Sequence, residues 1–149
     1  TDYIKRLIGL PGDKIQFIKG EIYINDKKII REKIENKKTI RCGNFFLNTN
    51  TYTETLPNGL KHLVTYKKKG SLQNSKIYNV PTNHYFLLGD NRDCSKDSRY
   101  LDSVGYVNKL NLVGKARLIF FSNDTNISRL LKFWNIGKSF RFNRLLKGL

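Results

Sequence analysis

The segment from Gly89 to Arg99 concentrates groups that can do chemistry. It holds three carboxylates, three cations and two hydroxyls in eleven residues. It follows the apolar run Tyr85–Leu88, which is typical of a buried strand, and its first residues favour a turn at the strand's end. A charged loop is often plain solvated surface. Attached to a buried strand, however, alternating Asp and Arg can pair with each other and hold a serine hydroxyl at a fixed place.

Lys5 is the second candidate for chemistry. It lies between Ile4 and Leu7 in the segment Tyr3–Ile8, which has strand composition, so we expect its side chain to enter an apolar setting. A lysine amine held away from water loses its proton more easily and can act as a general base. The plain alternative is an exposed surface cation. A neutral amine needs an acceptor to orient it, and we expect Ser95 in that role because a hydroxyl adds no charge.

The elements that would position these groups are mostly strands. The segments Ile15–Ile18 and Glu21–Ile24 are predicted to form a hairpin around Lys19-Gly20. Residues 31–80 are rich in Lys, Asn and Thr and are predicted to form exposed strands, with a turn at Pro57–Gly59. Strand character returns at Val104–Val107 and Leu112–Phe121. The sequence therefore predicts a mostly β fold, with an antiparallel sheet or barrel-like core.

Three parts are predicted along the chain. Residues 1–30 and 80–122 would form the catalytic β-core, and residues 31–79 an inserted β-ribbon. Residues 123–149 form a basic, aromatic tail in which the apolar residues of 127–134 and 142–149 have helical spacing. Such a tail suits a membrane interface, and packing on the β-core is the alternative.

The composition is strongly basic. Twenty-eight Lys and Arg against 12 Asp and Glu give a net charge of +16, which predicts attraction to polyanions such as nucleic acid or an anionic membrane face. The two cysteines, Cys42 and Cys94, match no metal motif, and the sequence leaves open whether they pair. The sequence shows no run of 18 or more apolar residues and no signal peptide.

Two motifs resemble the bacterial type I signal peptidase family. They are residues 3–13 (Tyr-Ile-Lys-Arg-Leu-Ile-Gly-Leu-Pro-Gly-Asp) and residues 89–99, followed by Gly105 and Gly114-Lys115-Ala116. Lys5 stands where the endoplasmic-reticulum enzymes of eukaryotes carry His, so the resemblance is to the bacterial Lys branch. It implies the signal peptidase fold and a membrane-bound serine endopeptidase with a Ser/Lys dyad. Such enzymes remove signal peptides from exported preproteins after a small-x-small sequence.

The resemblance also implies roles for individual residues. Lys5 would be the general base, and Ser95 would hydrogen-bond its amine. The site would be supported by charged residues, mostly through salt bridges: Arg6, Asp90, Arg92, Asp97 and Arg99. The residues that match the substrate-binding strand, which pairs with the substrate backbone and lines shallow pockets, are Asp2, Tyr3 and Ile4. No metal ion and no other cofactor is implied.

In the resembled family, the nucleophilic serine lies upstream of the lysine motif, near a membrane-spanning helix. We therefore expect the nucleophile and the anchor upstream of Thr1, and no cleavage by the 149 residues alone. Thr1 itself as an N-terminal nucleophile is a formal alternative. The expected location is the bacterial cytoplasmic membrane, with the catalytic part on its outer, periplasmic face. The expected partners are preprotein signal peptides and an anionic membrane surface.

Two positions depart from the family's pattern. Cys94 stands where the family usually has Asn, and Asn108 where it usually has Pro. A thiol beside Ser95 would make the site sensitive to oxidation.

Two other functions stay open at this stage. A basic β-barrel that binds nucleic acid would use the cations and the stacking aromatics. However, the cations are spread along the chain without an RNA-binding motif, so no nucleic-acid partner is expected. A Ser/Lys self-cleaving repressor-type protease has a similar fold, but the long segment 31–80 and the complete motif at 89–99 argue against it.

Overall fold

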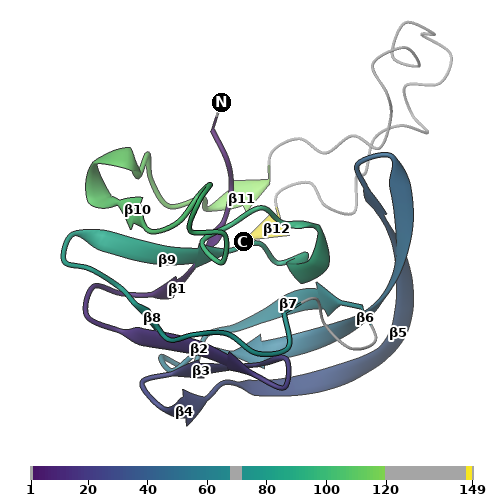
Figure 1. The fold of residues 1–149 in the computed structure, drawn as a ribbon. Coiled ribbons are helices and arrows are strands. Elements are labelled where there is room, and N and C mark those ends of the chain that lie inside the picture. The colour runs from purple at the N-terminus through teal and green to yellow at the C-terminus, as the bar shows by residue number, and fades with distance from the viewer. Residues whose placement is uncertain (1, 68–71, 120–146, 149) are drawn as a thin grey trace, which may run out of the picture. The chain divides into compact units, whose positions relative to one another are not determined.

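The computed structural model describes residues 2–67, 72–119 and 147–148 (Figure 1). In these ranges the regular structure is strand, apart from two short 3-10 turns, and every named sheet is antiparallel. The prediction of a mostly β, antiparallel fold is confirmed. The chain divides into two compact units, Thr1–Leu112 and Val113–Leu149.

One sheet of the first unit contains the strand that directly precedes the loop of residues 89–99, which carries Ser95. Its strands are β1 (Arg6–Gly9), β9 (His84–Leu88) and β10 (Val107–Asn108), in the order β1-β9-β10 (Figure 1). Gly9 pairs with Phe86 after an irregularity in the register. A Cβ at residue 9 would lie 3.0 Å from side-chain atoms of Ile15 and Phe86, so a glycine lets β1 approach the core.

A second sheet supplies much of the hydrophobic core. It consists of β2 (Lys14–Ile18), β3 (Glu21–Ile24), β4 (Lys27–Lys28) and β8 (Tyr78–Asn79), in the order β4-β3-β2-β8. The predicted hairpin at Lys19-Gly20 is confirmed, and both residues have positive φ, as the tightest hairpin turns require. Alternate residues of β2 and β3 point inward and join residues of β1 and β9 in the core. The core residues are Ile8, Ile15, Phe17, Ile22, Ile24, Ile29, Val80, Phe86 and Leu88.

The third sheet, called the ribbon sheet below, contains β5 (Ile30–Cys42), β6 (Phe45–Thr55) and β7 (Lys61–Tyr66). The predicted strands and the turn at 57–59 are confirmed, and Gly59 takes the positive φ of that turn. The expectation that these strands are exposed is wrong in part, because Glu54, Val64 and Tyr66 are buried. The boundaries 31–79 of an insertion stay a prediction; β8, which lies within them, pairs with β2.

Three expected elements differ from the structure. Residues 104–106 form a turn rather than a strand, because the amides of Val104 and Gly105 both donate to Tyr100 O and Gly105 has a φ of 55°. Residues 112–117 lie in no strand. In the second unit, β11 (Leu118–Ile119) pairs with β12 (Lys147–Gly148), so the helical pattern at 142–149 is wrong at residues 147 and 148. The remaining predictions for the tail, including the 127–134 pattern, fall outside the described residues.

Candidate active site

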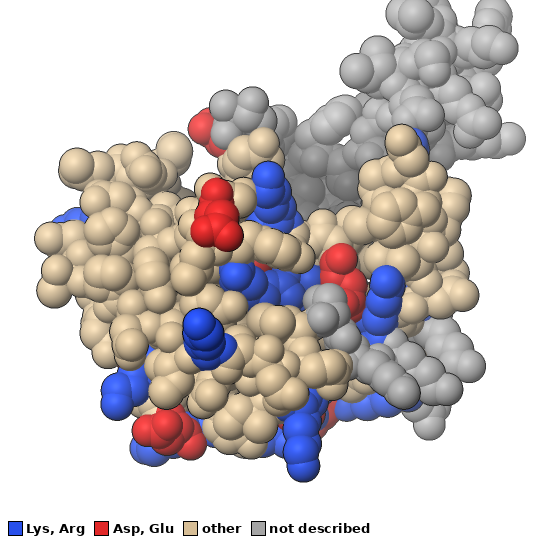
Figure 2. All heavy atoms as spheres, viewed as in Figure 1, with Lys and Arg blue, Asp and Glu red and all other residues tan. Residues whose placement is uncertain are grey.

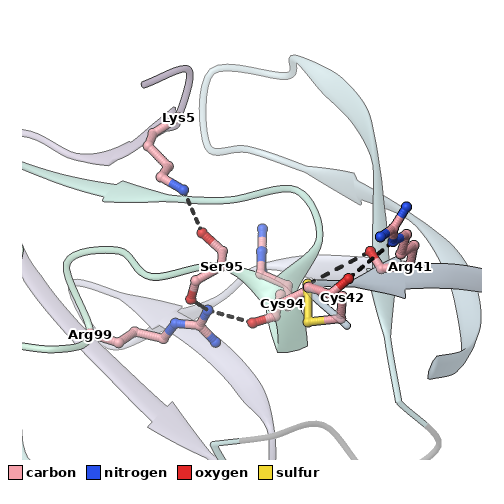
Figure 3. The surroundings of a disulfide bond; sticks show 8 residues. Lys5, Arg41, Cys42, Cys94, Ser95 and Arg99 are labelled. Carbon is pink, nitrogen blue, oxygen red and sulfur yellow. Dashed lines mark hydrogen bonds between the residues drawn. A yellow bond between two sulfur atoms is a disulfide. The ribbon is translucent and has the colours of Figure 1, made fainter. Parts of the chain in front are cut away.

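Lys5 and Ser95 meet although 90 residues separate them in sequence. Lys5 Nζ donates a hydrogen bond of 2.8 Å to Ser95 Oγ, in a partly buried setting. In Figure 3 the lysine side chain points down at the hydroxyl, and Arg99 lies on the opposite side of Ser95. Because one N–H of Lys5 is used in the hydrogen bond to the Ser95 hydroxyl, this bond fixes the orientation of the rest of the amine.

The segment around Lys5 differs from the sequence expectation. The strand begins at Arg6 rather than at Tyr3, and the flanking apolar residues are exposed, Ile4 by 77% and Leu7 by 42%. The prediction that Lys5 lies in an apolar setting is therefore wrong for the flanking residues Ile4 and Leu7. The side chain is half-buried because it reaches across to the loop that follows β9.

Gly89, the first residue of that loop, lies directly against Ser95. A Cβ at residue 89 would lie 2.2 Å from Ser95 Oγ and 3.7 Å from Lys5 Nζ. Such a distance is far inside van der Waals contact, so no larger residue fits unless Ser95 moves. The amide of Gly89 donates to Asp97 Oδ2 at 3.0 Å, which ties the first part of the loop to its later part.

Asp97 is completely buried and organises the second half of the loop. Arg99 Nε donates to Asp97 Oδ1 at 2.7 Å, and Arg99 Nη2 donates to Asp97 Oδ2 at 2.8 Å. The same Nη2 donates to the carbonyl of Arg92 and, at 3.4 Å, to the carbonyl of Ser95. Ser98, also buried, exchanges hydrogen bonds with the Leu87 backbone, accepting from its amide at 2.9 Å. The polypeptide on the far side of Ser95 is thus fixed to β9.

Arg6 and Asp90 form a two-point ion pair. Arg6 Nε and Nη2 donate to the two oxygens of Asp90 at 2.7 and 2.8 Å. The pair is more exposed than the Asp97–Arg99 pair, with 45% of the Asp90 side chain accessible to solvent. Because Asp90 and Asp97 each have a guanidinium partner, a hydroxyl rather than a carboxylate is the group that binds the amine of Lys5.

Arg92 is buried and begins the 3-10 turn η1 (Arg92–Cys94), which is part of the loop. Its Nη1 donates to Glu54 Oε1 at 2.8 Å, its Nη2 pairs with Glu54 Oε2, and its Nε donates to Gly89 O at 3.2 Å. The sequence predicted Arg92 to be a supporting residue; its side chain forms a buried ion pair with Glu54, and its supporting role stays a prediction.

Glu54 is a residue that the sequence reading missed. Burial alone would raise the pKa of this carboxyl, but it is lowered from 4.5 to about 2 by His62, whose Nε2 lies 3.4 Å from Glu54 Oε2, by the charge and hydrogen bonds of Arg92, and by a hydrogen bond from Tyr66. Tyr66 OH donates to Glu54 Oε1 at 2.8 Å, and burial raises the pKa of this phenol. The only sequence signal was one carboxylate inside the Thr- and Tyr-rich run of β6.

Cys42 and Cys94 form a disulfide, which the sequence had left open (Figure 3). The bridge spans 52 residues and joins the end of β5 to the last residue of η1, directly before Ser95. The free thiol beside Ser95 that the sequence suggested is therefore absent from the described structure.

Asp2, Tyr3 and Ile4 lie before β1 and belong to no strand. All three are exposed, Tyr3 by 79% and Ile4 by 77%. Their role in binding a substrate backbone stays a prediction.

Figure 2 shows Lys and Arg side chains spread over the visible face, with acidic side chains between them. Within the described ranges, no helix has the length and apolar character that crossing a membrane requires. The same ranges hold no group of three or more His, Cys, Asp or Glu side chains placed to bind a metal ion.

Comparison with known proteins identifies the family. Residues 1–121 match the family described as signal peptidase, peptidase S26. The chain belongs to this serine peptidase family. It is 42% identical to the signal peptidase I of Rickettsia typhi (strain ATCC VR-144 / Wilmington), over 99% of this chain and 59% of that protein. It is also 42% identical to the signal peptidase I of Rickettsia bellii (strain OSU 85-389), over 100% of this chain and 55% of that protein.

The S26 chain therefore spans less than two thirds of the length of these relatives. Among solved structures it is similar to a signal peptidase I from Enterococcus faecalis V583, with 26% identity over 74% of this chain and 78% of the other. The TM-score of that superposition is 0.37.

Proposed function

We propose that this chain is the base-bearing part of a signal peptidase I, which removes signal peptides from exported preproteins after small-x-small sequences. The observation that carries the proposal is the 2.8 Å hydrogen bond between Lys5 Nζ and Ser95 Oγ, in a chain of the S26 family. Family membership also favours a peptidase over a nucleic-acid binder or a self-cleaving repressor.

In the proposed reaction, the neutral amine of Lys5 removes the proton from an attacking serine hydroxyl. The serine oxygen then forms a bond to the scissile carbonyl carbon, and the protonated amine gives its proton to the leaving nitrogen. Water hydrolyses the resulting ester, with Lys5 again acting as base. Ser95 fixes the direction of the amine throughout. Arg6 with Asp90, and Asp97 with Arg99, hold the backbone from which Lys5 and Ser95 extend.

We propose that the attacking serine is not one of these 149 residues. The supporting observation is that Ser95 accepts a hydrogen bond from Lys5 Nζ and is itself fixed by Arg99 and by the close approach of Gly89. A residue fixed in this way is suited to position the amine rather than to attack a substrate. The relatives are long enough to supply another segment, since the matched part covers 55–59% of their length.

We also propose that the substrate adds an extended segment alongside Asp2, Tyr3 and Ile4, which are exposed and outside any strand. Main-chain pairing would give affinity there, and small pockets would exclude large side chains. The net charge of +16 supports a location at an anionic membrane face, which we propose is the outer face of the bacterial cytoplasmic membrane.

The test measures cleavage of a synthetic preprotein with an Ala-x-Ala site by the full-length protein and its Lys5→Ala and Ser95→Ala variants. We expect Lys5→Ala to lose most of the rate enhancement and Ser95→Ala to lower kcat by about 10²-fold or more. Lys14→Ala, which removes an exposed lysine of β2, is the matched control and should cleave normally. Normal cleavage by Lys5→Ala would contradict the proposed function. Robust cleavage by the isolated 149 residues would contradict the assignment of the attacking serine to another segment.

A further inference from the structure

Five consecutive loop residues attach to the ribbon sheet or to the residue that follows it. Asp90 O accepts from Thr65 N at 2.9 Å, and Asn91 forms an isolated bridge with Thr65. Arg92 pairs with Glu54, Asp93 accepts from the amide of Lys67, and Cys94 is bonded to Cys42. The loop is therefore fixed to the ribbon sheet residue by residue up to Cys94, and Ser95 is the next residue.

Three features set the attachment at Cys94 apart from the others. It is covalent, and it comes from β5, whereas the preceding attachments come from β6, β7 and residue 67. It also acts on the residue bonded to Ser95. On the other side of Ser95, the next fixed points are the buried Asp97 and the hydrogen bond from Arg99 Nη2 to Ser95 O. Ser95 is thus held between the disulfide and Arg99 (Figure 3), and Arg99 is itself paired with Asp97.

We propose that the Cys42–Cys94 disulfide positions Ser95 against Lys5 and makes the peptidase fully active only in its oxidised form. The inference rests on the function proposed above. Cys42 and Cys94 are positioning residues, since neither touches the amine of Lys5 in the structure and both act through Ser95.

The redox step needs a dithiol as the reductant. Its two thiols give two electrons and two protons, the Cys42–Cys94 bond breaks, and two protein thiols form while the dithiol closes to its own disulfide. Both cysteines are half-buried rather than enclosed, so a small dithiol reaches them. The reverse reaction restores the bond.

Reduction should loosen Ser95 without unfolding the chain. The buried pair of Arg92 with Glu54, the backbone contacts of Thr65 and the core remain when the disulfide opens. The distance between Cys94 and β5 is then no longer fixed, and the hydroxyl of the next residue, Ser95, becomes more mobile. Small displacements of a positioning group lower the rate of the chemical step more than they lower substrate affinity.

The first experiment compares kcat and KM of the oxidised and the dithiol-reduced full-length protein on an Ala-x-Ala preprotein. We expect kcat to fall about tenfold on reduction, with KM little changed. The Cys42→Ser/Cys94→Ser double variant should have the reduced protein's kcat and should not respond to the dithiol. In a Ser95→Ala background, reduction should have no further effect, because the disulfide acts through Ser95. An unchanged kcat after the reduction has been verified by mass spectrometry overturns the proposal.

A second readout does not depend on cleavage. The rate at which an amine-acylating reagent modifies Lys5 is followed by mass spectrometry in the oxidised and reduced forms, with exposed Lys14 as the internal control. We expect Lys5 to react faster after reduction and Lys14 to react at an unchanged rate. If the protein cleaves no preprotein in either form, the proposed function fails, and the acylation rates then decide the positioning role alone. Equal Lys5 rates in both forms overturn that role.

Discussion

Gly89 and Ser95 lie so close together that residue 89 has no room for a side chain: its Cβ would be 2.2 Å from Ser95 Oγ. Gly89→Ala should therefore push the Ser95 hydroxyl away from Lys5 and lower kcat by roughly 10²-fold in the full-length protein. The stability cost should be about 1–3 kcal/mol, as for other overpacked sites. Cleavage kinetics and thermal unfolding measure the two effects separately.

Gly114→Ala is the matched control for that substitution, because a Cβ at residue 114 meets no atom within 4 Å. It should leave kcat unchanged. A Gly89→Ala variant with full activity would show that Ser95 does not need its observed position.

The two aspartates that pair with arginines should differ sharply in their effect on stability. Asp97 is completely buried, so Asp97→Asn leaves the Arg99 guanidinium without its charged partner and should cost about 3–5 kcal/mol. Asp90 is 45% exposed at its side chain, so Asp90→Asn should cost about 1 kcal/mol or less. Urea unfolding of both variants provides the comparison, and equal losses would contradict the difference in burial.

Acid stability should depend on Glu54. Its pKa is about 2 in the folded chain against 4.5 in the unfolded chain, so the ionised carboxylate stabilises the fold fully above pH 4.5. That contribution, roughly 3 kcal/mol at 1.36 kcal/mol per pH unit, is lost progressively as the pH falls from 4.5 towards 2. The free energy of unfolding, measured by urea titration across this range, should therefore fall more steeply for the wild type than for Glu54→Gln.

Glu54→Gln itself should be less stable at neutral pH by about 3–5 kcal/mol, because Arg92 stays buried without a counter-charge. Parallel curves for the two proteins below pH 4.5 would show that Glu54 does not carry the acid dependence.

Membrane association should be electrostatic. With a net charge of +16, the chain should bind vesicles that contain anionic lipid and release them as salt is raised, and it should not bind neutral vesicles. Cosedimentation with vesicles at about 50 mM and about 500 mM salt compares binding under weak and strong screening of the charges, and so tests this prediction. A chain that lacks residues 125–149 should bind more weakly, and undiminished binding by it would assign the association to the remaining cations.

The sequence predicted the parts of this molecule that local chemistry determines. The Lys19-Gly20 and Pro57–Gly59 turns were found because glycine accepts the positive φ of a turn and proline fixes its own φ. Lys5 and Ser95 were found because the family motifs around them are long. Their distance of 2.8 Å came only from the structure, since it depends on how β1 and β9 pair.

The sequence failed where the partner of a residue is distant. Glu54 looks like an exposed strand residue until Arg92, 38 residues later, is placed beside it. The Cys42–Cys94 bond joins the ends of two elements whose approach no spacing rule predicts. At Val104 and Gly105, strand composition was overridden by two amides that donate to one carbonyl, that of Tyr100.

The attachment of residues 90–94 to the ribbon sheet also bears on the order of folding. The strands that receive the loop are complete at residue 66, before the loop itself has been synthesised. Contacts between positions this far apart in sequence form slowly, because a long stretch of chain must be ordered first. During biosynthesis the amine of Lys5 therefore lacks its hydrogen bond to Ser95 until nearly two thirds of these 149 residues have been synthesised.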